Sequence, residues 1–240
     1  MKIFDPERGE GVYQMFAEDA LPHWTYWDTV ATEAASNIVW IIATQNIETL
    51  DHMLRVADLA RTLGGWMGLS SSRIRALELA ALLHDIGKLG VPPQILCKEG
   101  PLTPEEKRKI KIHPEFGARL IASLPCQLLK QVARTIEQHH ERWDGGGFPK
   151  GLKQTEIMLE ARILAVADTF DALTSPRPYR AEPLTMEEAK KEIMKNAGTQ
   201  FDPLVALTFV THFGQLPNGA QQVACREVRE PGYEQPERLS

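Results

Sequence analysis

Apolar positions recur at three- and four-residue spacing along most of the chain, which is the pattern of amphipathic helices. We predict helices over residues 24–63 with a break near 46, and over 70–85, 103–113, 114–123, 125–140, 158–174, 185–196 and 202–213. No stretch gives a convincing strand pattern. The long segment from Glu141 to Glu156 contains Gly145, Gly146 and Gly147 and cannot be regular helix. The fold class predicted from the pattern is therefore all-α.

Local signals support several of these helix ends. Thr103 with Glu106 three residues later forms a capping box, and Pro104 stands at the first helical position. Pro114 disfavours helix in the residue before it, so we expect the preceding helix to end at His113. Gly87 is expected in the left-handed conformation just past a helix end.

The chain divides into three predicted parts. Residues 1–45 are an N-terminal helical segment, interpreted as a signalling helix or a cap, and residues 46–213 are the main helical domain. Residues 214–240 are polar, contain Pro and Gly, and are predicted to be a mobile tail.

Composition narrows the functional classes. The 240 residues are 43% hydrophobic, which is ample for a core, and the net charge of -5 argues against DNA as a partner. Cys97, Cys126 and Cys225 are too far apart for a Cys-x-x-Cys pair, so a reducing cytoplasm fits better than a disulfide framework. The N-terminus lacks a signal-peptide core, and the longest apolar run, 38–43, is too short to span a bilayer. We predict a soluble cytoplasmic protein.

Metal-capable side chains recur at helix ends or on buried helix faces. They come from five separate segments: Glu48, His52, His84, Asp85, His113, His139, His140 and Asp168. Imidazole and carboxylate ligands suit Fe, Mn, Zn, Ni or Co, and the lack of thiolates argues against a structural zinc.

Each candidate also has a simpler interpretation when it is taken alone. His52 could be a core histidine and Glu48 part of a solvated face. The pair His139-His140 could end a helix whose dipole favours cations. Asp168 is different, because a carboxylate inside an apolar helix needs a partner.

Such a set allows hydrolysis of a phosphodiester. Two or three cations about 3.5–4 Å apart could hold a bridging hydroxide, with Asp85 and Glu48 as the bridging carboxylates. Lys88, Arg177 and Arg180 are candidates for holding phosphate oxygens, although Arg177 and Arg180 could equally be a solvated loop.

The order of the motifs resembles the HD-GYP branch of the HD phosphohydrolase superfamily. The matching motifs are Glu48-Thr49-Leu50-Asp51-His52, Leu83-His84-Asp85-Ile86-Gly87-Lys88, His113-Pro114-Glu115, His139-His140-Glu141-Arg142-Trp143-Asp144-Gly145, Ala167-Asp168-Thr169-Phe170-Asp171-Ala172 and Gly198-Thr199-Gln200-Phe201-Asp202-Pro203. The resemblance covers roughly residues 48–213.

This resemblance implies an HD-type helical bundle around a di- or trinuclear metal site, with the eight candidates as ligands. Iron or manganese is the implied metal, and the implied activity is hydrolysis of cyclic di-GMP to pGpG and/or GMP. The family uses positions matching Lys88, Asp171, Arg177 and Arg180 around the substrate phosphates or the attacking hydroxide. The resemblance also allows a signalling partner protein to bind at the loop Gly147-Phe148-Pro149, and it allows the chain to form a homodimer.

Two motifs depart from the family pattern. Phe148 replaces the signature tyrosine; this keeps an aromatic ring, as a predicted substrate contact, but loses the hydroxyl. In the first motif, Asn46 replaces a frequent aspartate and Leu50 replaces a glycine. Two rival functions stay open: hydrolysis of another cyclic dinucleotide or a nucleotide, and a module that binds cyclic di-GMP or a partner without turnover.

Overall fold

The computed structural model describes residues 47–98, 100–123, 126–176 and 182–213. Its α-helices are α3 (Ile47–Trp66), α4 (Ser71–Leu83), α5 (Pro93–Leu96), α6 (Pro104–Ile110), α7 (His113–Ala122), α8 (Gln127–Gln138), α9 (Leu159–Thr174), α10 (Met186–Lys195) and α11 (Pro203–His212). Two 3-10 turns, η1 (Ile86–Gly90) and η2 (Gln154–Glu156), lie between them. Within these ranges the sole β feature is an isolated bridge, so the all-α prediction is confirmed.

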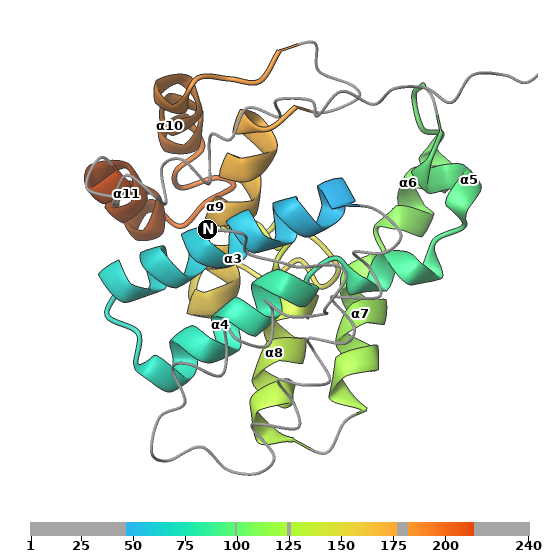
Figure 1. Ribbon diagram of the computed structural model, residues 1–240, viewed down its shortest axis with the longest axis horizontal. Coiled ribbons are helices and arrows are strands. Elements are labelled where there is room, and N and C mark those ends of the chain that lie inside the picture. The colour runs from blue at the N-terminus through green and yellow to red at the C-terminus, as the bar shows by residue number, and fades with distance from the viewer. Residues whose placement is uncertain (1–46, 99, 124–125, 177–181, 214–240) are drawn as a thin grey trace, which may run out of the picture.

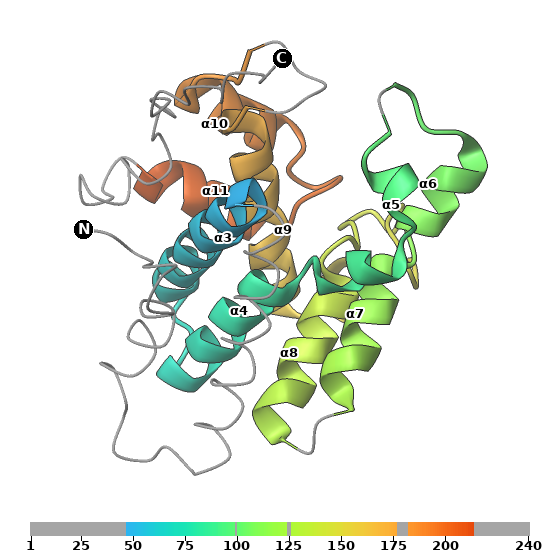
Figure 2. The ribbon, with the colours of Figure 1, turned by 45° about the vertical axis from the view of Figure 1, so that its right-hand side comes forward.

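The helices pack as a bundle around α3, α4, α8 and α9. Helix α3 lies along α4 and α9, while α8 packs on α4, on α7 and on α9 (Figure 1). Helices α10 and α11 pack on α9, away from α7 and α8 (Figure 2). Fully buried side chains such as Leu63, Leu77, Ile136 and Phe170 fill the space between these helices. The bundle thereby brings the ends of α4 and α8 and the start of α7 close to the middle of α3 and α9.

The helix boundary near His113 differs from the sequence prediction. Helix α6 ends at Ile110, and His113 begins α7 rather than ending the helix before it. The sequence analysis predicts no helix between residues 86 and 102, but this segment contains η1 and α5. Elements of four or five residues are too short to leave a periodic apolar signal.

The capping signals of the sequence are present in the structure. The side chain of Thr103 accepts a hydrogen bond from the backbone of Glu106, whose carboxylate accepts from the backbone of Thr103 in return. Asp202 caps α11 by accepting from the backbone of Leu204 at 2.8 Å. These bonds satisfy amide groups that the first turn of a helix leaves without a partner.

Gly87 does not adopt the left-handed conformation that the sequence analysis predicts for it. Gly87 is not among the glycines with positive φ. It is needed because η1 lies directly against α7, where a Cβ on Gly87 would be 1.9 Å from the carbonyl oxygen of His113 and 2.7 Å from the backbone nitrogen of Gly117. Only a residue without a side chain allows this backbone approach.

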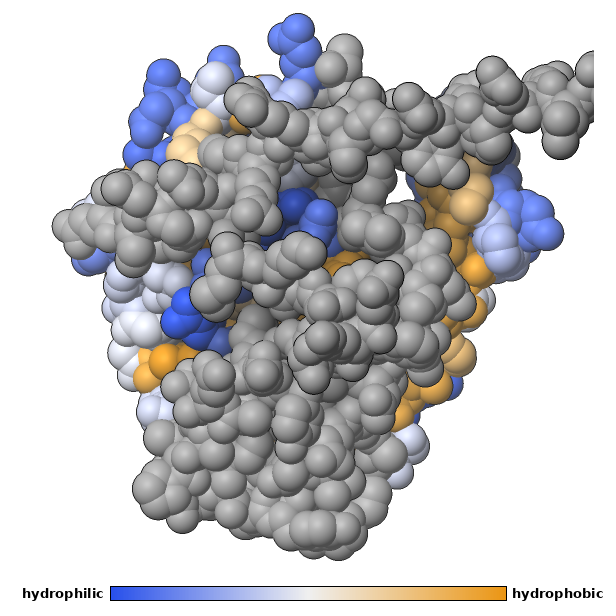
Figure 3. Space-filling view, viewed as in Figure 1, coloured by the Kyte–Doolittle hydropathy of each residue, from blue (hydrophilic) through white to orange (hydrophobic). Residues whose placement is uncertain are grey.

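Hydrophobic residues reach the surface along one edge of the molecule, on the side of α5, α6 and α7 (Figure 3). Exposed apolar side chains of this region include Leu96, Ile112, Phe116 and Leu120. Among the helices that the structure describes, none combines the length and apolar character that a bilayer span requires. The predicted parts 1–45 and 214–240 lie outside the described residues, so the domain division stays a prediction.

Candidate metal centre

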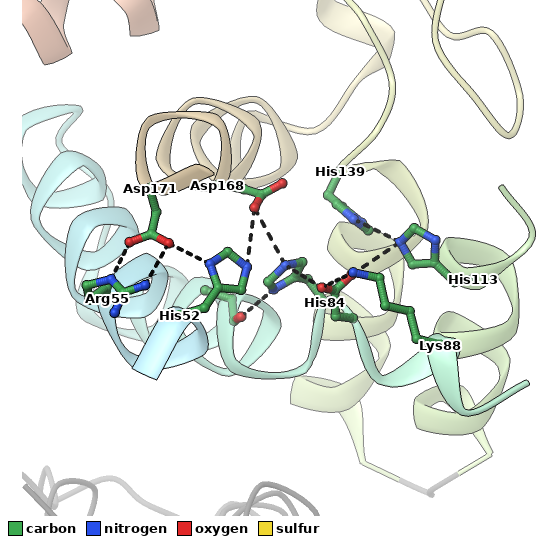
Figure 4. Close-up of polar contacts among 10 residues, drawn as sticks. His52, Arg55, His84, Lys88, His113, His139, Asp168 and Asp171 are labelled. Atoms are coloured by element: carbon green, nitrogen blue, oxygen red, sulfur yellow. Dashed lines mark hydrogen bonds and ion pairs between the residues drawn. The ribbon is translucent and has the colours of Figure 1, made fainter. Parts of the chain in front are cut away.

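Four buried histidines from four different places in the bundle converge on one centre (Figure 4). His52 lies inside α3, His84 directly follows α4, His113 opens α7 and His139 directly follows α8. Three of the four therefore sit at helix ends, where the chain can change direction without breaking the bundle.

The same helix ends orient three of the rings. Nδ1 of His84, His113 and His139 lies 2.7, 2.8 and 2.6 Å from the backbone carbonyl oxygen three residues earlier. Carbonyls in the last turn lack a partner within the helix, so they can accept from the ring. A neutral ring then carries its proton on Nδ1, and the lone pair of Nε2 is directed at the centre.

Asp85 stands between two groups of donors. One oxygen, Oδ2, is 3.5 Å from Nε2 of His84, and the other, Oδ1, is 3.5 Å from Nε2 of His113. His52, His84 and Asp85 each offer one ligand atom within 4.8 Å of the others, and so do His113, His139 and His140. The carboxylate of Asp85 is thus placed to reach both groups, although its role as a bridging ligand stays a prediction.

Asp168 of α9 extends the first group. Its Oδ1 lies 3.5 Å from Nε2 of His52 and 3.9 Å from Nε2 of His84. A carboxylate inside an apolar helix needs a polar partner, and Asp168 has one. Its side chain is 20% exposed and faces the histidines rather than the core.

The second group contains a contact that a cation would relieve. Nε2 of His113 and Nε2 of His139 are 3.4 Å apart. Since both rings use Nδ1 as the donor to a carbonyl, both Nε2 atoms are unprotonated in the neutral rings and cannot hydrogen-bond to each other. A metal ion accepts both lone pairs, so this pair fits a metal site.

The charge states also suit metal binding. Burial, with the neighbouring histidines His84 and His113, lowers the pKa of His139 to about 3, and burial lowers the pKa of His140 as well. Burial would raise the pKa of Asp85, but the ammonium group of Lys88 holds it well below its ordinary value. His139 and His140 therefore present neutral imidazoles and Asp85 an ionised carboxylate, which are the forms that bind divalent metals.

Lys88 is the cation next to the centre. Its Nζ lies 2.5 Å from Oδ2 of Asp85, and its side chain is 41% exposed. The ammonium group of Lys88 therefore lies beside the metal-ligand candidates and is also open to the solvent.

Asp171, for which the resemblance implies a place around the substrate phosphates or the attacking hydroxide, is buried next to His52, and its role toward the substrate stays a prediction. Its carboxylate is 1% exposed, and Nδ1 of His52 lies 2.7 Å from its Oδ2. Arg55 occupies both of its oxygens, with Nε 2.5 Å from Oδ1 and a terminal nitrogen 3.1 Å from Oδ2. Asp171 is thus placed behind His52, not at the open side of the centre.

The irregular segment before α9 covers the second group. Its backbone is held by the buried carboxylate of Glu141, which accepts hydrogen bonds from Lys150 at 2.7 Å and from Leu152 at 3.1 Å. The ring of Phe148 lies 4.9 Å from the ring of His140, and Nζ of Lys111 is 5.0 Å from the Phe148 ring centre. Phe148 therefore borders the centre.

Three predicted site residues cannot be placed. The side chain of Glu48, in the first turn of α3, and the residues Arg177 and Arg180 lie outside the part of the chain that the structure describes. Their roles stay predictions.

Arg55 and Lys111 were missed in the sequence. Arg55 follows His52 by three residues and so shares its helix face, which was a usable signal. Lys111 precedes His113 by two residues inside a run of basic residues, which gave no reason to single it out.

Comparison with known proteins agrees with this geometry. The family model described as an HD domain matches residues 28–205. The chain is 42% identical over 166 residues to a cyclic di-GMP phosphodiesterase of Thermotoga maritima, covering 69% of this chain and 45% of the relative. It is 32% identical over 184 residues to 3'3'-cGAMP-specific phosphodiesterase 2 of Vibrio cholerae, covering 77% of this chain and 35% of the relative.

A solved structure has the same fold. An HDGYP protein from Bdellovibrio bacteriovorus superposes with a TM-score of 0.58 at 21% identity, covering 87% of this chain and 70% of that chain. The chain spans less than half the length of the two curated relatives named above.

The HD-type bundle expected from the motifs is confirmed, and the His and Asp groups support binding of divalent metal. With the family model matching residues 28–205, this chain belongs to the HD domain family.

Proposed function

We propose that this protein is a metal-dependent phosphodiesterase that hydrolyses cyclic di-GMP to pGpG and/or GMP. The observation that carries the proposal is the position of Asp85, whose two oxygens each lie 3.5 Å from a histidine of a different donor group. The first relative reported above is named for this activity. Candidate metal ligands on both sides of one carboxylate are more than a module that only binds cyclic di-GMP or a partner would need.

The metals would be two or three ions, with iron or manganese as our proposal. His52, His84, Asp85 and Asp168 would hold one ion, and His113, His139 and His140 would hold another with Asp85 between them. Glu48 is the proposed ligand of a third. Bound divalent ions supply a nucleophilic hydroxide at neutral pH and stabilise the negative charge that develops on the phosphoryl oxygens.

The protein's own groups bind and orient the phosphodiester. The ammonium group of Lys88, beside Asp85 and partly exposed, is placed to hold a phosphoryl oxygen. Arg177 and Arg180 are proposed to hold the other phosphate oxygens. The ring of Phe148 and the ammonium group of Lys111 form the border of the centre, where a base or a second phosphate of a dinucleotide can rest.

A second candidate substrate is 3'3'-cGAMP, because a relative that is 32% identical is named as specific for it. It shares with cyclic di-GMP the two phosphodiester linkages and differs in one base. Both substrates place the reaction in bacterial second-messenger signalling, which would be cytoplasmic. A signalling partner at the Gly147–Pro149 loop and a homodimer belong to the same proposal.

The decisive experiment is product analysis by chromatography and mass spectrometry. Protein purified without oxygen is loaded with Mn or Fe and incubated with cyclic di-GMP, 3'3'-cGAMP and mononucleotides in parallel. Cleavage of cyclic di-GMP to pGpG or GMP, lost in Asp85→Ala, is the expected result. Hydrolysis of mononucleotides without cleavage of cyclic di-GMP, or binding of cyclic di-GMP without turnover, would contradict the proposal.

A further inference from the structure

The four oriented histidines of the centre are not held in the same way. His84, His113 and His139 each use Nδ1 on a neutral backbone carbonyl. His52 instead uses Nδ1 on the carboxylate of Asp171, at 2.7 Å. A carboxylate behind a metal-ligating imidazole raises the basicity of the ring and fixes its orientation more strongly than a neutral acceptor does.

Arg55 fixes that carboxylate from the other side. Its Nε and a terminal nitrogen approach Oδ1 and Oδ2 of Asp171 at 2.5 and 3.1 Å, which is the two-point fork of an arginine–carboxylate pair (Figure 4). The side chains of Arg55 and Asp171 are 19% and 1% exposed, so water competes little for these bonds. The fork sets the plane of the carboxylate and therefore the direction of the lone pair that meets His52.

The charges of Arg55 and Asp171 also support a fixed position of the carboxylate behind His52. Arg55 is always charged, and its guanidinium group contacts both oxygens of the buried Asp171 carboxylate, so a full positive charge is paired with it. Arg55 and His52 are three residues apart on α3, while Asp171 comes from α9. The contacts of His52 and Arg55 with Asp171 therefore join α3 to α9, and they also fix the distance between His52 and Asp168, which comes from the same helix as Asp171.

We propose that Arg55, acting through Asp171, is a positioning residue that gives the His52–His84–Asp85 group a higher metal affinity than the His113–His139–His140 group. The two groups would then fill in order, with the His52 group first. The inference rests on the metal-binding part of the proposed function and not on any substrate.

The test is a cobalt titration of metal-free protein, without nucleotide, followed by the visible absorbance of bound Co²⁺. Wild-type protein is expected to show two classes of site. Arg55→Gln is expected to weaken the tighter class by about 10- to 100-fold, the range typical of lost partners behind a metal ligand, and to leave the weaker class unchanged. Arg55→Lys keeps the charge without the fork and is expected to fall between wild type and Arg55→Gln.

Arg61→Gln is the matched control. Arg61 lies on the same helix and pairs with Asp58 and Glu78 away from the centre, so both classes should keep their affinity. Melting of the metal-free variants separates affinity from folding, and Arg55→Lys serves if Arg55→Gln does not fold. A single class in wild type, equal weakening of both classes, or an unchanged tight class in Arg55→Gln and Arg55→Lys would overturn the proposal.

Because no nucleotide is present, the result is independent of which phosphodiester the enzyme cleaves. An intact protein that binds cobalt in two classes but cleaves no cyclic dinucleotide would contradict the proposed function and leave this inference standing.

Discussion

The α-carbon of Gly87 faces the backbone of His113 so closely that an added methyl group would lie 1.9 Å from the His113 carbonyl oxygen. One ordinary side chain at this position would separate η1 from α7. His113 begins α7 and belongs to one donor group, while Asp85, two residues before Gly87, lies between the groups. The glycine thus sets the spacing between two parts of the centre.

Gly87→Ala is therefore expected to lower the free energy of unfolding by about 3 kcal/mol or more, because a clash with backbone cannot be relieved by a rotamer change. Metal content should fall with it. Chemical denaturation and elemental analysis measure the two effects. Gly65→Ala is the control: it lies in α3 with nothing within 4 Å of an added methyl group, so it should be neutral or stabilising by up to about 1 kcal/mol. Equal stability of the two variants would contradict this account of Gly87.

Asp85→Asn tests the carboxylate between the groups. The substitution keeps the shape of the side chain but removes the charge, so the proposed phosphodiesterase activity should fall by more than about 100-fold and less metal should be retained. Turnover of cyclic di-GMP and metal per chain after gel filtration are the measurements. Asp58→Asn, which removes an α3 carboxylate paired with Arg61, should change neither. Normal turnover in Asp85→Asn would refute the assignment.

Phe148→Leu tests the border of the centre. The variant loses the ring that lies 4.9 Å from His140 and faces the ammonium group of Lys111. Aromatic and cation–π contacts are worth about 0.5–1.5 kcal/mol, so KM for the dinucleotide should rise about 2- to 10-fold while kcat and metal content change little. Steady-state kinetics with Phe116→Leu, an exposed phenylalanine of α7, provides the comparison. A fall in kcat or in metal content with an unchanged KM would show that the ring supports the metal centre instead.

The ion pair between Arg73 and Glu160 gives a pH-dependent prediction for stability. Nε of Arg73 lies 2.7 Å from Oε1 of Glu160 and joins α4 to α9. Burial would raise the pKa of Glu160, but the hydrogen bond from Arg73 holds it below its ordinary value. Since the folded pKa is lower than the unfolded one, the pair stabilises the fold above the unfolded pKa of about 4.3, and this stabilisation is lost as the pH falls through the folded pKa.

Glu160→Gln should accordingly cost about 1–2 kcal/mol at pH 7, the scale of a hydrogen bond to a charged group. The difference from wild type should shrink below about pH 4. Urea unfolding at several pH values measures it, with Glu105→Gln, an exposed carboxylate of α6, as the control. A difference that stays constant down to pH 3 would contradict the assignment.

The sequence alone determined the all-α class, most of the helices and the residues available for chemistry. These properties depend on spacing and on local signals: apolar periodicity, the Thr103–Glu106 capping box, and histidines next to helix ends. Local signals of this kind act within one or two turns of a helix and can be read without knowing the partners. The order of the motifs along the chain also predicted the family, and the match of the HD domain model over residues 28–205 confirms this prediction.

The tertiary structure decided how those residues face one another. His52 and Asp171 are 119 residues apart, and no local pattern shows that they meet or that Arg55 fixes the pair. The need for Gly87 likewise comes from the backbone of α7, not from a turn. The physical reason is that burial and close packing pair side chains from different helices, whereas periodicity reports only the face on which each side chain lies.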